Sequence, residues 1–229
     1  MSPTTLTQQL SHANETIRDG WTPANATWTY ASASTITVSS GAAAKYAKGD
    51  KIKLTQTTVK YFYVVGVADT VLTVTGGSDY TVADAAITLN YYSHVSSPIG
   101  FPKVFNYTPS FNLTTLGNGT ITGQFYIDNN EIHVSASFLL GSTSAVAAGV
   151  SILLTNLPSE SSLYTSRQYS VGRGTGKDAG AAFTEACDMI FFAGDRIRFV
   201  TAAGAAWSNA IPFTWAEGDT LMCRLSYNF

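Results

Sequence analysis

The stretch Val95-Ser96-Ser97-Pro98-Ile99-Gly100-Phe101-Pro102-Lys103 separates two strand-rich halves of the sequence and contains two of its seven prolines. Proline lacks a backbone N–H and disfavours helical geometry in the residue before it. Neither a helix nor a central strand therefore passes easily through this stretch. We interpret residues 95–103 as a linker between a domain over residues 21–94 and a domain over residues 104–229.

The composition indicates a protein with a weakly charged surface. The chain has 229 residues, of which 45% are hydrophobic, and this is enough to build two modest cores. Charged residues make up 12% and the net charge is −2, so no basic field is present to attract nucleic acid. No apolar run approaches the roughly 20 residues that span a bilayer, and the amino terminus lacks the pattern of a secretory signal. We expect a protein made in the cytoplasm, without nucleic-acid binding or membrane insertion.

The first twenty residues carry a helix pattern. Ser2 is a possible N-cap before Pro3, and Gly20 follows the last residue that could be helical. The apolar stripe consists of Leu6, Leu10, Ala13 and Ile17. Their spacing of four, three and four is typical of a short coiled coil or of a helix packed on its own domain. At roughly two heptads the helix needs a neighbour, either another part of the chain or copies of itself in an oligomer.

The region that follows the helix alternates with period two, which predicts β-strands. The predicted strands span residues 35–38, 51–54, 61–64, 71–74 and 87–89. Turns are predicted at Gly41, at Gly49, at Gly66 and across residues 76–79. Short strands with tight turns and no intervening helix indicate a small antiparallel β-barrel or sandwich over residues 21–94.

The second half is also predicted to be β-structure. Asn129-Asn130 suits the tight turn of a hairpin, and a second hairpin is predicted between residues 189–192 and 196–200. Further strands are predicted at residues 111–113, 120–127, 150–157, 211–215 and 219–227. About eight strands is the number in a jelly roll, so we predict a jelly-roll-like β-sandwich. The Gly-rich residues 172–180 and the Ala-rich residues 201–207 are then interpreted as loops.

No motif in the sequence specifies a chemical reaction. Residues 171–178 superficially resemble a phosphate loop, but the first glycine is one position too close and Asp178 replaces the magnesium-binding hydroxyl. The three histidines, at His12, His94 and His133, have no metal-ligand spacing. Carboxylates next to predicted turns, where capping is the usual role, are Asp128, Glu131, Glu217 and Asp219. We therefore predict no enzyme, no metal and no cofactor.

The two cysteines are far apart in sequence. Cys187 and Cys223 lack the paired spacing of a zinc site or a redox motif. We predict that they are buried free thiols, because a disulfide would require their strands to be neighbours.

Large side chains in or near predicted loops of the second half are candidates for binding. They are Tyr164, Arg167, Tyr169 and Trp207. Aromatic rings stack on sugars and, with arginine, supply many binding hot spots. The alternative is that these aromatic residues simply cover the edge of the core.

Two parts of the sequence resemble structural proteins of tailed-bacteriophage particles. Residues 49–56 (Gly-Asp-Lys-Ile-Lys-Leu-Thr-Gln) with residues 60–65 (Lys-Tyr-Phe-Tyr-Val-Val) resemble small β modules of tail and fibre proteins. Residues 213–221 (Phe-Thr-Trp-Ala-Glu-Gly-Asp-Thr-Leu) resemble the closing strands of fibre-tip or receptor-binding jelly rolls. The resemblance implies a virion protein that forms a homotrimer or another symmetric oligomer, attached at one end and displaying the other. It assigns no catalytic or binding residue.

The leading functional hypothesis is a tail-fibre or tail-tip protein that displays a receptor-binding β-sandwich. In this hypothesis the N-terminal part contacts other virion proteins and the C-terminal domain contacts a host cell-surface glycan or protein. The alternatives are a capsid decoration or head-fibre protein, and an enzyme or a cellular carbohydrate-binding module.

Overall fold

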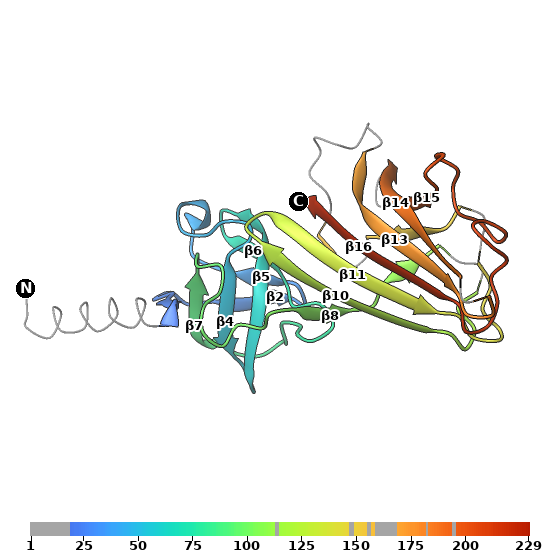
Figure 1. Ribbon diagram of the computed structural model, residues 1–229. Coiled ribbons are helices and arrows are strands. Elements are labelled where there is room, and N and C mark those ends of the chain that lie inside the picture. The colour runs from blue at the N-terminus through green and yellow to red at the C-terminus, as the bar shows by residue number, and fades with distance from the viewer. Residues whose placement is uncertain are drawn as a thin grey trace, which may run out of the picture. The chain divides into compact units, whose positions relative to one another are not determined.

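The computed structural model describes residues 19–112, 115–146, 149–154, 157–158, 169–181, 183–193 and 196–229. These residues form two antiparallel sheets with almost no helix (Figure 1), which confirms the predicted all-β class. Contacts between Cα atoms divide the chain into two units. One comprises Met1–Phe105 with Ile127–Asn130, and the other comprises Asn106–Tyr126 with Glu131–Phe229. The predicted helix stripe of Leu6, Leu10, Ala13 and Ile17 lies outside the described residues.

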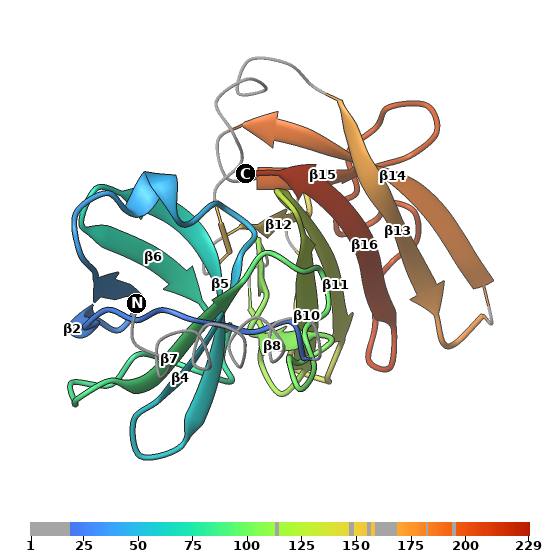
Figure 2. The ribbon, with the colours of Figure 1, turned by 90° about the vertical axis from the view of Figure 1, so that its left-hand side faces the viewer.

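The first unit contains a seven-stranded sheet in the order β1-β7-β4-β5-β6-β3-β2, of which Figure 2 labels β2, β4, β5, β6 and β7. Its strands are β1 (Thr22–Pro23), β2 (Thr29–Ser32), β3 (Thr35–Thr37), β4 (Lys51–Thr55), β5 (Val59–Ala68), β6 (Val71–Thr75) and β7 (Thr88–Ser93). A single turn of 3-10 helix, η1 (Ala42–Ala44), follows β3. The core includes Trp28, Ile36, Ile52, Phe62 and Leu72, each at most 1% exposed. All five predicted strands of this region are present, because alternating apolar residues point into this core.

The structure differs from the prediction at Gly66 and refines it at the predicted linker, residues 95–103. Gly66 lies inside β5 at a register shift, so the predicted turn there is wrong. Residues 95–103 contain no strand, as proposed, but they pack on the first unit. The indole N–H of Trp21 donates to the carbonyl oxygen of Ile99 at 2.8 Å, and the ring centroid of Phe101 lies 4.9 Å from that of Tyr63.

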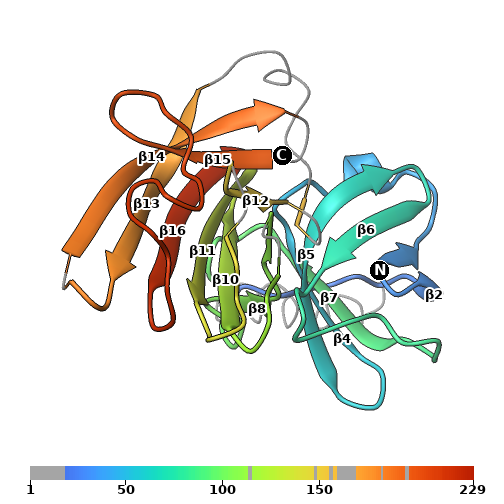
Figure 3. The same ribbon diagram turned by 90° about the vertical axis from the view of Figure 1, so that its right-hand side faces the viewer.

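The second sheet has nine strands in the order β8-β10-β11-β16-β13-β14-β15-β12-β9 (Figure 3). They are β8 (Phe105–Tyr107), β9 (Ser110–Phe111), β10 (Thr120–Asp128), β11 (Glu131–Leu139), β12 (Ser151–Leu153), β13 (Ser170–Asp178), β14 (Phe183–Ala193), β15 (Arg196–Val200) and β16 (Thr220–Asn228). The edge strands β8 and β9 are joined by only Thr108 and Pro109. Each residue spans at most about 3.6 Å, so the sheet must curl until its two edges approach each other.

The predicted hairpins of the second half are confirmed. Asn129 has a φ of 54° in the turn between β10 and β11. Strands β14 and β15 pair with Phe191 opposite Ile197, and the predicted turn between them includes residues 194 and 195, which are outside the described part. The predicted strands at 120–127, 150–157 and 219–227 correspond to β10, β12 and β16.

The largest correction concerns the Gly-rich residues 172–180. Most of them belong to β13, which lies between β14 and β16, so the predicted loop is wrong. Glycine is depleted in strands, but here large side chains occupy the space above it. A Cβ atom at Gly174 would lie 2.7 Å from the Phe199 ring, and one at Gly176 would lie 2.9 Å from the Trp207 ring.

The predicted strand at residues 211–215 is also wrong. Only an isolated bridge between Ser208 and Ile211 is present there. Pro212 has no N–H to donate to a sheet, which explains why the apolar residues of this stretch do not continue a ladder. The predicted loop over residues 201–207 contains no strand, with only an isolated bridge at Ala206.

The cysteines are buried free thiols, as predicted. Gly174 of β13 is the register partner of Cys187 on β14 and of Cys223 on β16, so a whole strand separates the two cysteines. Neighbouring strands are about 4.8 Å apart, which places the two backbones about twice that distance apart, too far for a disulfide. Burial raises the pKa of each thiol to about 12.

We expect both thiols of the native chain to resist a thiol reagent at pH 8. At a pKa of about 12 only about one thiol in ten thousand is ionised, against about a tenth at the ordinary value of 9.0. Reaction with a coloured disulfide reagent, followed with and without denaturant, measures this protection. Complete labelling of the native chain within minutes would contradict the buried placement.

Candidate functional site

The residues predicted to bind a receptor do not form one exposed cluster. Tyr164 and Arg167 lie outside the described residues. Tyr169 is half-buried and stacks on Phe191 of β14, with centroids 5.7 Å apart. Trp207 is 0% exposed and stacks on Phe199 of β15. The ring of Trp207 therefore belongs to the core and has no free face for a ligand.

The described histidines have structural partners. His94 Nδ1 lies 2.8 Å from the carboxylate of the buried Asp50, which also accepts a hydrogen bond from the Ala47 N–H. The His133 ring stacks on Tyr126 with centroids 4.5 Å apart. His12 lies outside the described part. Within the described residues, no group of three or more His, Cys, Asp and Glu side chains could hold a metal ion.

The predicted capping role of Asp219 is confirmed. This carboxylate is fully buried at the start of β16, and its two oxygens accept hydrogen bonds from the N–H groups of Ala179 and Ala216. Each oxygen is therefore bound to one of two separate segments, the turn after β13 and the stretch before β16. Asp219 holds these segments together, and its burial keeps a ligand from its oxygens.

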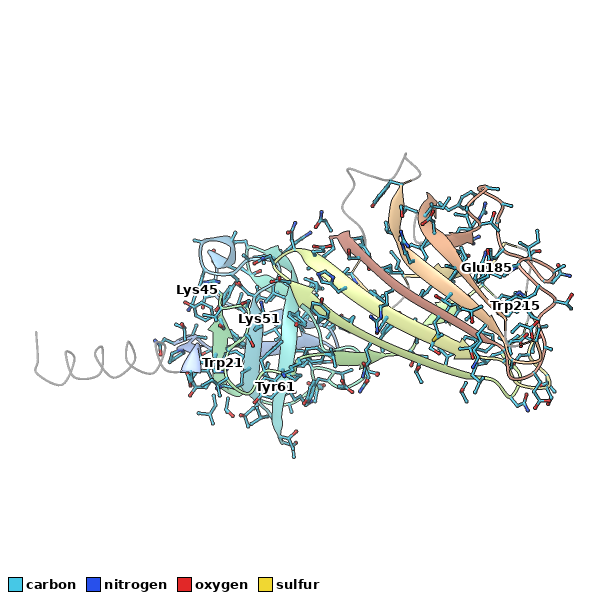
Figure 4. The ribbon with its side chains drawn as sticks, in the orientation of Figure 1. Trp21, Lys45, Lys51, Tyr61, Glu185 and Trp215 are labelled. Atoms are coloured by element: carbon cyan, nitrogen blue, oxygen red, sulfur yellow. The ribbon has the colours of Figure 1, made fainter. Side chains whose placement is uncertain are left out.

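Lysine side chains of the first unit lie over aromatic rings. Lys53 Nζ is 4.6 Å from the Trp21 ring centroid and 4.5 Å from that of Tyr91. Lys51 and Lys45 lie over other tyrosine rings of the same unit, and Trp21, Lys45, Lys51 and Tyr61 can be followed in Figure 4. Burial lowers the pKa of all three lysines. These ammonium groups are held by the ring faces, a stabilising contact within the fold.

A hollow of about 680 Å³ lies on the face of the second sheet across β10, β11, β16 and β13. We call it the arginine groove. It contains Arg173 and Arg224, the partly exposed Met222, and the hydroxyl or amide side chains of Asn106, Thr122, Gln124, Ser135, Ser137 and Thr175. No carboxylate is among the described residues that line it.

Strand alternation determines which side chains reach this groove. In β16, Leu221, Cys223 and Leu225 are buried, whereas Met222 and Arg224 between them are exposed. Successive side chains of a strand point to opposite faces. Because the alternate residues are buried in the core, the residues between them face the groove. The same alternation in β11 brings Ser135 and Ser137 to the groove.

The register places the two arginines directly opposite each other. Arg173 on β13 pairs with Arg224 on β16. Ser135 is the next partner of Arg224, and the exposed Asp188 on β14 is the next partner of Arg173. Neither guanidinium makes a hydrogen bond or ion pair with any other residue in the described ranges. Like charges directly opposite in a sheet repel each other, and Asp188 offsets this repulsion only on the Arg173 side.

The row beside the arginines is polar and nearly uncharged. Met222 pairs with Ser137 on one side and with Thr175 on the other. Next to this row, the side-chain amide of Gln124 donates to the Asn106 side-chain oxygen at 3.2 Å. The groove therefore offers hydroxyl and amide groups, which both donate and accept hydrogen bonds, around a small apolar area at Met222.

Comparison with known proteins gives no match to a family model, to a curated protein or to a solved structure. None of the helical segments among the described residues has the length and apolar character needed to cross a membrane.

Proposed function

We propose that this chain is a structural component of a tailed-bacteriophage virion, a tail-fibre or tail-tip protein that displays a host receptor-binding β-domain. The observation that carries the proposal is the arginine groove. Two exposed guanidinium groups, which make no hydrogen bond or ion pair with another described residue, stand on a sheet whose backbone is fixed by hydrogen bonds on both sides. Such a rigid surface with accessible donors is suited to binding.

The proposal includes a finer architecture. The first unit is a small β-barrel or sandwich, and the second is a jelly-roll-like sandwich at the distal end. Support comes from the short connection between β8 and β9, which requires the second sheet to curl. Closing a sheet on itself protects its edges from pairing with other chains, a property useful in a protein present in many copies.

We also propose that the chain forms a homotrimer and that its N-terminal part contacts other virion proteins. Support comes from the heptad-like spacing of Leu6, Leu10, Ala13 and Ile17. In this arrangement the protein binds and has no catalytic role. The carboxylates of Asp50 and Asp219 take part in hydrogen bonds within the fold, which agrees with that assignment.

Competition with the phage for its host is expected if the second unit contacts the receptor. The purified full chain, added before the phage that carries it, should reduce adsorption in a dose-dependent way, because it occupies the same receptors. Labelled antibodies should bind at the tail of the particle. Labelling confined to the capsid, with no competition at saturating protein, would contradict the proposal and favour a capsid decoration or head-fibre protein.

A further inference from the structure

The arginine pair has a carboxylate beside it on one side only, at Asp188, and none within the groove. Arg173 and Arg224 are direct partners on adjacent antiparallel strands, where Cβ atoms lie about 5 Å apart. Asp188 flanks Arg173 on its far side but does not line the groove, and the far partner of Arg224 is the neutral Ser135. An anion placed between the two side chains would relieve their repulsion and receive hydrogen bonds from both guanidinium groups.

The surroundings of the pair restrict the kind of molecule that carries this anion. Hydroxyl groups of Ser135, Ser137 and Thr175 and the Gln124 amide lie along the groove, and such groups match the hydroxyls of a sugar. Met222, which is 41% exposed, offers an apolar surface to the C–H face of a sugar ring. The groove therefore combines one charged position with several neutral polar positions.

Two other classes of ligand fit less well. Single-stranded nucleic acid needs aromatic platforms and a broader positive field, whereas the described lining has no aromatic ring and the chain has a net charge of −2. An extended peptide adds to an exposed sheet edge, but β16 and β13 are interior strands whose backbone groups are already paired.

We propose that the arginine groove binds an anionic oligosaccharide, with its carboxylate or phosphate held between Arg173 and Arg224 and neighbouring sugar hydroxyls bound by the Ser, Thr and Gln side chains. This inference rests on the proposed function, because it names the class of receptor that the second unit recognises. The anion can be a uronic acid or a sugar phosphate, since both accept paired hydrogen bonds from guanidinium groups.

Calorimetric titration of the full chain tests the ligand class. The probes are a short oligogalacturonate, its methyl ester, a phosphorylated mannan oligosaccharide and a polyglutamate peptide. We expect binding of at least one charged saccharide, and the stronger of the two identifies the anion. Where the oligogalacturonate binds, its methyl ester, which keeps the sugar backbone but loses the charge, should bind at least about tenfold more weakly. Failure of both charged saccharides, an ester that binds as tightly as a binding oligogalacturonate, or stronger binding of polyglutamate would overturn the proposal.

Variants of the chain test the site itself. Arg173→Gln with Arg224→Gln should weaken saccharide binding by about a hundredfold, because each lost charged hydrogen bond typically costs about a factor of ten. The matched control is Arg196→Gln, an exposed arginine on β15 outside the groove lining, which should bind as the wild type does. The melting temperature of the unliganded double variant should equal or exceed that of the wild type, since the repulsion is removed. Unchanged saccharide binding in a folded double variant would overturn the site.

The same variant separates this inference from the proposed function. If the double variant loses saccharide binding but still competes for adsorption, the receptor contact lies elsewhere and only the groove's assignment as receptor site fails. In the opposite case, the wild-type chain binds the saccharide but does not compete for adsorption, and antibodies locate it on the capsid. The groove then remains a saccharide site, and the receptor-binding function fails.

Discussion

Gly174→Val is expected to lower the free energy of unfolding by about 3 kcal/mol, at the upper end of the usual cost of overpacking. A Cβ atom at Gly174 would lie 2.7 Å from Cys187 Sγ and from two atoms of the Phe199 ring. The fully buried ring has no space into which to move, and β13 is bonded on both sides. Urea unfolding followed by tryptophan fluorescence measures the change.

The matched control for this variant is Thr175→Val, the next residue of the same strand. It introduces the same side chain on the opposite face, where Thr175 lines the open groove, so its effect should stay within about 0.5 kcal/mol. Equal destabilisation by the two variants would show that a valine anywhere in β13 is harmful. That result would contradict the packing of Phe199 against Gly174 on the inner face of β13.

The difference between predicted and missed strands has a physical origin. Strands such as β11 and β16 carry their core residues in their own sequence, so alternation of apolar and polar residues reveals them. In β13 the volume above the strand is filled from elsewhere, by Phe199 and Trp207, and its own inward positions are glycines. The sequence of residues 172–180 contains the glycines but not the distant rings that pack on them, so by itself it predicts a loop.

The candidate site was hidden for the same reason. The alternation around Arg224 marks it as an outward residue, but its partner Arg173 falls in the stretch interpreted as a loop. Their pairing depends on register between distant strands, which composition and spacing do not reveal. Because Trp207 lies in a predicted loop, the sequence alone leaves open whether it is a binding contact or covers the edge of the core. Its backbone is irregular, yet its ring turns inward to fill the space over Gly176.

Trp207→Ala is expected to destabilise the chain by about 4 kcal/mol, within the range for removing a large buried aromatic ring. The ring is 0% exposed and lies 5.7 Å from Phe199 and 5.8 Å from Trp215, centroid to centroid. Trp207→Phe is the control, because it keeps an aromatic ring in this stack and removes an indole N–H without a partner among the described residues. It should recover more than half of the loss. Equal losses in the two variants would contradict a packing role.

Coupling between Trp207 and Gly176 tests the same packing from the other strand. A Cβ atom at Gly176 would lie 2.9 Å from the Trp207 ring and 3.0 Å from the Trp215 ring, so Gly176→Ala alone should be destabilising. In a Trp207→Ala background one of these clashes is absent, and the penalty of Gly176→Ala should fall by about 1 kcal/mol. If the stability effects of the two substitutions were strictly additive, the Trp207 ring would not contact position 176. Because Trp207→Ala acts through stability, lost adsorption in this variant would report unfolding, whereas lost adsorption in the folded Arg173 and Arg224 variant would report the receptor contact.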